Sequence, residues 1–147
     1  MLIAAHSISA GVAGEVIGNP ILAFFLGFIL HFVLDAIPHF DTTDAGKFTK
    51  RQIVLLSKDA ITGLIILYFL FTNSSNQLAF LAAVLGGLLP DILDNVPWWS
   101  DKFRASRFGT IFHAFHQKIQ SIKLKPILGI SIQYVIILIS ICIFLYK

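Results

Sequence analysis

Five apolar segments follow one another along the chain, separated by short polar connectors. They comprise residues 2–18, 20–37, 53–72, 78–96 and 126–146. A helix needs roughly 20 apolar residues to cross the hydrocarbon layer of a bilayer. The last four segments meet that length, whereas the first is short, rich in Ala and Gly, and expected to enter the membrane or cross it at a tilt. The pattern predicts an all-α membrane protein: a bundle of four to five transmembrane helices in a single domain, 1–147.

A further amphipathic stretch lies between the fourth and fifth segments, at residues 108–119. Its apolar side chains recur at helical spacing: Phe108, Ile111, Phe112, Phe115 and Ile119. His113 and His116 fall on one flank of this stripe. The spacing predicts an amphipathic interfacial helix that lies under the bundle with its apolar face in lipid or protein.

The composition agrees with a membrane location. Hydrophobic residues make up 56% of the chain and charged residues 13%, whereas a soluble domain is about a quarter charged. The net charge of +3 does not indicate nucleic-acid binding, because the basic residues flank apolar segments and form no dense patch. The first residues lack the charged leader and cleavage site of a secretory signal, so we expect them in the mature protein.

The placement of basic residues predicts the orientation. The connector after the second segment and the connector after the fourth hold Lys47, Lys50, Arg51, Lys58, Lys102, Arg104, Arg107, Lys118, Lys123 and Lys125. The connectors at residues 18–20 and 73–77 hold none. By the positive-inside rule, both basic connectors face the cytoplasm, and the protein is integral to the cytoplasmic membrane.

This topology brings all five histidines and four aspartates near the cytoplasmic leaflet, leaving Glu15 toward the other side. They are His6, His31, Asp35, His39, Asp59, Asp91, Asp94, His113 and His116. Ionisable side chains are costly within or beside apolar segments, which favours a functional role. Imidazole and carboxylate groups are ligands for divalent metals. The sequence therefore predicts a membrane-embedded metal site.

Helical spacing supports shared ligands within two segments. His31 and Asp35 are four residues apart, Asp91 and Asp94 are three apart, and each pair shares a helix face. The alternative is a set of interhelical hydrogen bonds and salt bridges, such as Asp59 with Lys58 or Arg51. For the whole set, too few buried cations are available to make that alternative sufficient.

The evidence for the histidines outside these pairs is weaker. His113 and His116, three residues apart, are compatible with chelating one ion. His39 lies near Asp41 and Asp44 and is expected at the membrane interface, with a ligand role open. His6 suits either a ligand or a packed polar side chain.

The second and fourth segments end alike. Residues 27–38 can be laid over residues 86–97, which aligns Asp35 with Asp94 and Pro38 with Pro97. Both helices would run from the outside to the inside, so the repeat would be parallel about the membrane normal. The two aspartates would then face one another and share a metal, while the two prolines end their helices.

The motifs His6, Leu89-Pro90-Asp91 with Asp94, and His113 with His116 resemble those of the small bacterial and archaeal membrane-bound metal-dependent hydrolases. Two spacings depart from the usual pattern, because members show Asp-x-Asp and His-Arg-x-x-Thr-His. The resemblance implies a helical fold in a prokaryotic membrane, a divalent metal and hydrolase activity. The set of expected metal ligands is also similar, more distantly, to that of the all-helical zinc-dependent phospholipases C.

The sequence thus predicts a hydrolase that acts on a phosphoester-containing lipid or lipid-linked substrate at the cytoplasmic leaflet. The predicted metal ligands are His6, His31, Asp35, Asp91 and Asp94, and the predicted catalytic or supporting residues are Asp59, His113 and His116. Zinc is the first choice for this mixed set, with manganese or magnesium as alternatives. The rival hypotheses are an ion-coupled or metal transport protein, which would need a homo-oligomer, and a non-catalytic structural protein with a metal site.

Overall fold

The computed structural model describes residues 1–40 and 49–147, and this part of the chain is all-helical, as predicted. Its helices are α1 (Ile3–Ile17), α2 (Pro20–Asp35), α3 (Lys50–Thr72), α4 (Gln77–Asn95), α5 (Pro97–Arg104), α6 (Arg107–Ile119) and α7 (Pro126–Tyr146). Within these ranges the only β-type pairing is an isolated parallel bridge between His39 and Lys123. Asp41, Asp44 and Lys47 lie outside the described residues.

Local sequence signals set most helix boundaries. Gly18 ends α1 in the left-handed conformation, with φ of 69°, and the Asn19 side chain caps α2. Thr49 and Gln52 form a capping box at the start of α3. Helix α2 has 16 residues and ends two residues before the predicted segment does. Helix α5, which the apolar pattern does not predict, begins at a proline directly after α4.

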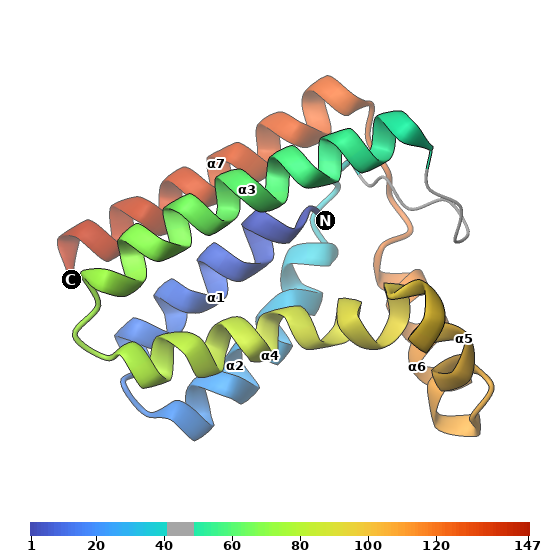
Figure 1. Ribbon diagram of the computed structural model, residues 1–147, viewed down its shortest axis with the longest axis horizontal. Helices are drawn as coiled ribbons and strands as arrows, with labels where there is room; N and C mark the ends of the chain where they lie inside the picture. The colour runs from blue at the N-terminus through green and yellow to red at the C-terminus, as the bar shows by residue number, and fades with distance from the viewer. Residues whose placement is uncertain (41–48) are drawn as a thin grey trace.

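Helix α1 occupies the centre of the bundle. In Figure 1 it lies between α2 and α4 on one side and α3 and α7 on the other, and it contacts all four. Eleven of its 15 residues are buried, many of them Ala, Gly or Ser. Small side chains let helix backbones approach closely, so this composition suits a central helix. At its far end, the Glu15 carboxylate accepts hydrogen bonds from the backbone N–H groups of Ser75 and Asn76, both at 3.0 Å.

Helices α2 and α4 run in the same direction and pack closely through two glycines (Figure 1). A Cβ atom on Gly27 would lie 2.2 Å from the carbonyl oxygen of Ala83, and one on Gly86 would lie 2.0 Å from that of Phe24. Gly27 thus faces Ala83, three positions before Gly86, and Gly86 faces Phe24, three positions before Gly27. This reciprocal contact is what the proposed repeat requires, although the duplication itself stays a prediction.

Three helices are long and apolar enough to span a membrane: α3 over Gln52–Thr72, α4 over Gln77–Asn95 and α7 over Pro126–Tyr146. Their outward faces expose large apolar side chains, such as Ile65 and Tyr68 on α3 and Leu138 on α7. Contiguous apolar surface of this kind suits contact with lipid. With 15 and 16 residues, α1 and α2 are about 22–24 Å long, less than the roughly 30 Å of the hydrocarbon layer.

Candidate metal centre

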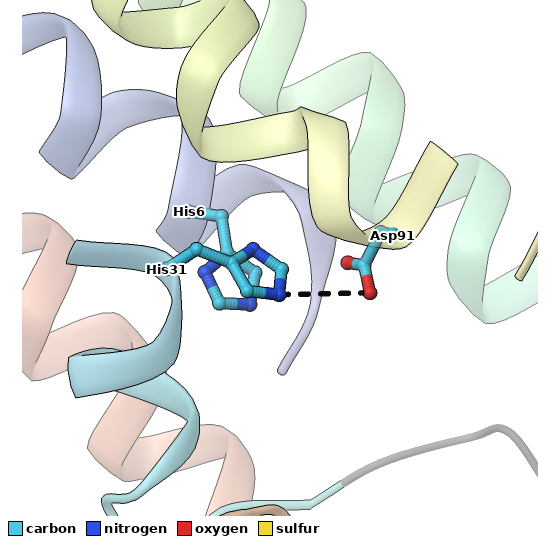
Figure 2. A group of neighbouring side chains, drawn as sticks. All are labelled: His6, His31 and Asp91. Atoms are coloured by element: carbon cyan, nitrogen blue, oxygen red, sulfur yellow. Dashed lines mark ion pairs between the residues drawn. The ribbon is translucent and has the colours of Figure 1, made fainter. Parts of the chain in front are cut away.

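Four helices and one connector bring ionisable side chains together at the end of the bundle that carries the N-terminus, α5 and α6 (Figure 1). Figure 2 shows His6 of α1 and His31 of α2 stacked, with Asp91 of α4 facing them. The two imidazole ring centroids are 4.0 Å apart, with 17° between the ring planes. Helix α6 adds His116, so residues more than 100 positions apart in the sequence meet here.

The centre of this cluster is a triangle formed by His31 Nε2, His116 Nε2 and Asp35 Oδ2. Each pair of these atoms is 3.1 Å apart. All three side chains are buried, with at most 2% of any residue exposed. A tetrahedral zinc ion with bonds of about 2.0–2.1 Å holds its ligands about 3.3 Å apart. The triangle therefore has nearly the dimensions of three zinc ligands. We call it the metal triangle.

The hydrogen bonds behind the two imidazoles direct their lone pairs toward each other. The Nδ1–H of His31 donates to the backbone carbonyl of Gly87 at 2.7 Å. The Nδ1–H of His116 donates to Asp94 Oδ2 at 3.0 Å. A neutral imidazole carries one N–H, so each Nε2 then presents a lone pair. Two lone pairs facing at 3.1 Å repel unless a cation lies between them or one ring gains a proton.

His116 lies in α6, outside the candidate membrane spans, and its protonation reflects the same charge balance. Burial lowers the pKa of His116, but its hydrogen bonds to Asp35 and Asp94 outweigh burial and raise that pKa to about 9. At neutral pH the metal-free ring is therefore an imidazolium held between two carboxylates. A metal ion bound at the triangle would displace this proton, because only the neutral ring offers a lone pair.

Asp91 lies beside the metal triangle on its accessible side. Its Oδ1 is 3.8 Å from His31 Nε2 and 3.9 Å from His116 Nε2. Its side chain is 20% exposed, whereas those of the three triangle residues are fully buried. The side-chain amide of Asn95 donates to Asp91 Oδ1 at 2.8 Å and holds this rotamer. Water or a substrate would therefore approach from the Asp91 side.

Asp94 lies behind His116 and not at the triangle. Its two oxygens accept hydrogen bonds from His116 Nδ1 at 3.0 Å, His113 Nδ1 at 2.7 Å and Arg104 Nε at 2.9 Å. The sequence analysis predicts Asp94 as a ligand and His113 as a catalytic residue. The geometry instead suits Asp94 and His113 to orienting His116. His113 contacts one oxygen of Asp94 and His116 contacts the other. Sequence reasoning missed Arg104, whose only signal was its place in a basic connector.

The Asp59 side chain hydrogen-bonds to the backbone at the start of α1. Its Oδ2 accepts a hydrogen bond from the backbone N–H of Ala4 at 3.0 Å, at the end of the helix where N–H groups lack partners within the helix. This contact gives Asp59 a structural role, and the catalytic role assigned to it from the sequence stays a prediction.

The second oxygen of Asp35 has its own set of neighbours. Oδ1 lies 3.1 Å from His6 Nε2, 2.8 Å from the Met1 amino group and 3.8 Å from His39 Nε2. His39 was expected at the interface, but only 1% of it is exposed. The Met1 contact was missed because a terminal amino group has no side-chain signature. Gln120, also missed, contacts His116 Nε2 through its side-chain amide.

The chain matches no protein-family model, no curated protein and no solved structure. The metal centre therefore stands on the geometry of its own residues.

We expect Asp94→Asn to weaken zinc binding by about 10–100-fold, the usual effect of losing a partner that orients a ligand. An amide still fills the space, but it is a weaker acceptor for the Nδ1–H of His116. Isothermal titration of the purified protein with Zn²⁺ measures this change. Asp101→Asn, which alters an exposed carboxylate of α5, is the matched control and should leave the affinity unchanged. Equal affinities in the two variants would contradict the orienting role.

Proposed function

We propose that this protein is a membrane-embedded metal-dependent hydrolase of the small membrane-bound family that its motifs resemble. Its substrate is a phosphoester-containing lipid or lipid-linked molecule. The observation that carries the proposal is the metal triangle, in which two imidazole nitrogens and a carboxylate oxygen lie 3.1 Å apart. Zinc is the preferred ion for this donor set.

The proposed topology places the site at the depth of the lipid headgroups on the cytoplasmic side. In it, α3, α4 and α7 cross the membrane, α2 and the central α1 complete a bundle of four to five spans, and the basic connectors face the cytoplasm. Exposed Trp98 on α5, and Phe108, Ile111 and Phe115 on α6, support an interfacial position for these two helices at the end that holds the metal triangle.

Two cavities lined by residues of α3 and α7 support a lipid substrate, and neither is lined by a residue of the metal triangle or by Asp91. One, of about 150 Å³, is lined by residues of α1, α3 and α7, including Leu2 and Lys58. Its neighbour, of about 530 Å³, shares Leu55, Lys58 and Ile130 with it. Their walls are mostly apolar and suit an acyl chain that enters from the membrane, while Lys58 offers a positive charge and Asp59 a carboxylate at the wall of the smaller cavity. Leu2 adjoins Met1, whose amino group contacts Asp35.

Each residue of the site has a distinct task in this proposal. The ion would lower the pKa of a water molecule and stabilise negative charge on the phosphoester. His31, His116 and Asp35 hold the ion, and Asp94 keeps His116 in the tautomer that binds it. Asp91, partly exposed and less than 4 Å from both imidazoles, is placed to accept the proton of the attacking water.

The test is hydrolysis by the purified protein in nanodiscs, using a panel of phospholipids and lipid-linked phosphoesters. We expect zinc-dependent release of the phosphorylated or dephosphorylated headgroup, lost on chelation. Asp91→Asn should lower the rate by about 10²–10⁴-fold, the usual contribution of a positioned general base. Asp101→Asn on exposed α5 is the control and should keep wild-type activity.

The outcomes separate the rival functions. Stoichiometric zinc without turnover of any substrate in the panel would favour a structural metal site. Zinc flux into proteoliposomes, abolished by Asp35→Asn, would favour transport. A protein that binds no divalent ion would overturn the proposal.

A further inference from the structure

We infer that Asp35 bridges two metal ions, one at the metal triangle on Oδ2 and a second on Oδ1, next to His6. This inference deepens the proposed function, because it assumes the first ion and adds a second position to the same site.

The inference starts from the arrangement of nitrogen atoms around one buried carboxylate. Oδ2 of Asp35 lies 3.1 Å from both His31 Nε2 and His116 Nε2. Oδ1 lies 3.1 Å from His6 Nε2 and 3.8 Å from His39 Nε2, and the Met1 nitrogen is 2.8 Å away. Each oxygen therefore faces its own group of nitrogen atoms. The Met1 ammonium forms an ion pair with Oδ1 and would be displaced, or lose a proton, when an ion binds there. The two groups come from different elements: α2 and α6 supply the first, and α1 with the segment after α2 supplies the second.

One tetrahedral ion does not account for this donor set. An ion at the metal triangle would take three protein ligands and water as a fourth, which completes tetrahedral coordination. The nitrogen of His6 then remains directed at Oδ1, on the other side of the carboxylate. In two-metal sites the ions are about 3.5–4 Å apart, a separation that a carboxylate can bridge with one oxygen on each ion.

His6 provides an independent observation. The residue is 1% exposed, and within the described part of the chain its Nδ1 has no hydrogen-bond partner. Burying an unsatisfied polar atom costs about 1–3 kcal/mol. If His6 donates from Nε2 to Asp35, it buries a bare lone pair at Nδ1, so packing alone explains the residue poorly. An ion bound by Nε2 would leave the ring proton on Nδ1, which still has no partner among the described residues, but it would replace the hydrogen bond to Asp35 with a metal bond and give the buried ring a function.

A two-ion centre fits phosphoester hydrolysis. A pair of ions can stabilise both the attacking and the leaving oxygen during displacement at phosphorus. The second ion would also balance the negative charge that Asp35, Asp91 and the substrate bring into one buried site.

The first test counts ions. Protein without an affinity tag is equilibrated with Zn²⁺ by dialysis, and bound zinc is measured by elemental analysis. We expect two ions per wild-type chain and one per chain of His6→Ala. Asp101→Asn, which alters an exposed carboxylate of α5, is the control and should still bind two. Two ions bound by His6→Ala, or one by the wild type, would overturn the second position.

The second test needs no variant and so does not depend on the folding of His6→Ala. Wild-type protein loaded with Mn²⁺ should give the electron paramagnetic resonance spectrum of two exchange-coupled ions. A spectrum of one isolated Mn²⁺ per chain would overturn the bridge while leaving the metal triangle intact. Absence of any bound Mn²⁺ or Zn²⁺ would overturn both this inference and the proposed function.

Discussion

His116→Ala should bind zinc far more weakly than the wild type, by more than the 10–100-fold expected for Asp94→Asn. The substitution removes one of the three ligands of the metal triangle. An orienting partner such as Asp94 only positions a ligand, and its loss lowers the metal affinity by about 10–100-fold. It also leaves Asp35 and Asp94 without a shared buried donor. Isothermal titration with Zn²⁺ measures the affinity, and the rise in melting temperature on adding zinc provides a second readout, since binding to the folded state stabilises it.

Gln117→Ala is the control for this prediction, because Gln117 is the neighbour of His116 on the same helix and its side chain is exposed. It should retain most of the affinity and most of the zinc-induced stabilisation. His116→Asn keeps a polar side chain, so it tests whether packing alone explains the loss. Wild-type affinity in either His116 variant would exclude His116 as a ligand.

Gly86→Ala should give the largest loss of stability. Its Cβ would lie 2.0 Å from the backbone carbonyl oxygen of Phe24, and backbone cannot move aside as a flexible side chain can. Overpacking of this kind typically costs about 1–3 kcal/mol, and occasionally more. We expect the upper part of that range for the free energy of unfolding, measured by denaturant titration in detergent micelles.

The same substitution should also weaken zinc binding, because α2 carries His31 and Asp35 while α4 carries Asp91. Pushing the two helices apart separates the two ligands on α2 from Asp91, the proposed general base, and from Asp94, which orients His116. Leu85→Ala, next to Gly86 but 61% exposed on the outer face, is the matched control and should change neither quantity much. Unaltered stability of Gly86→Ala would show that α2 and α4 do not pack through these glycines.

The helices themselves were largely predictable because their signals are local. Apolar runs, capping residues and prolines act within a few positions, so the five segments and the amphipathic stretch reappear as α1–α4, α7 and α6. Helix α5 was missed because its eight residues are too few to establish a helical repeat in the sequence. The end of α2 was placed two residues too late, because Ala36 and Ile37 continue the apolar run beyond Asp35, the last residue of the helix.

The gathering of histidines and aspartates at one end was predictable from the sequence, but their mutual contacts were not. The basic residues of two connectors predict the orientation of the helices, because topology follows from local charge. That orientation predicts that the histidines and most aspartates lie at one end. Whether Asp94 would bind an ion or accept a hydrogen bond from Nδ1 of His116 depends on how α4 and α6 are rotated about their axes. That rotation is set by packing between residues distant in sequence, such as Gly27 and Gly86, which no local pattern contains.

From the sequence alone, the protein is a helical membrane protein whose imidazoles and carboxylates gather at one end, since hydropathy, caps and charge act locally. The tertiary structure decided the rest: that Asp35 is the shared centre, that Asp94 and His113 stand behind His116, and that Asp59 caps a helix. These roles depend on separations of a few ångströms between side chains of different helices. Only the close packing of the whole bundle determines such separations.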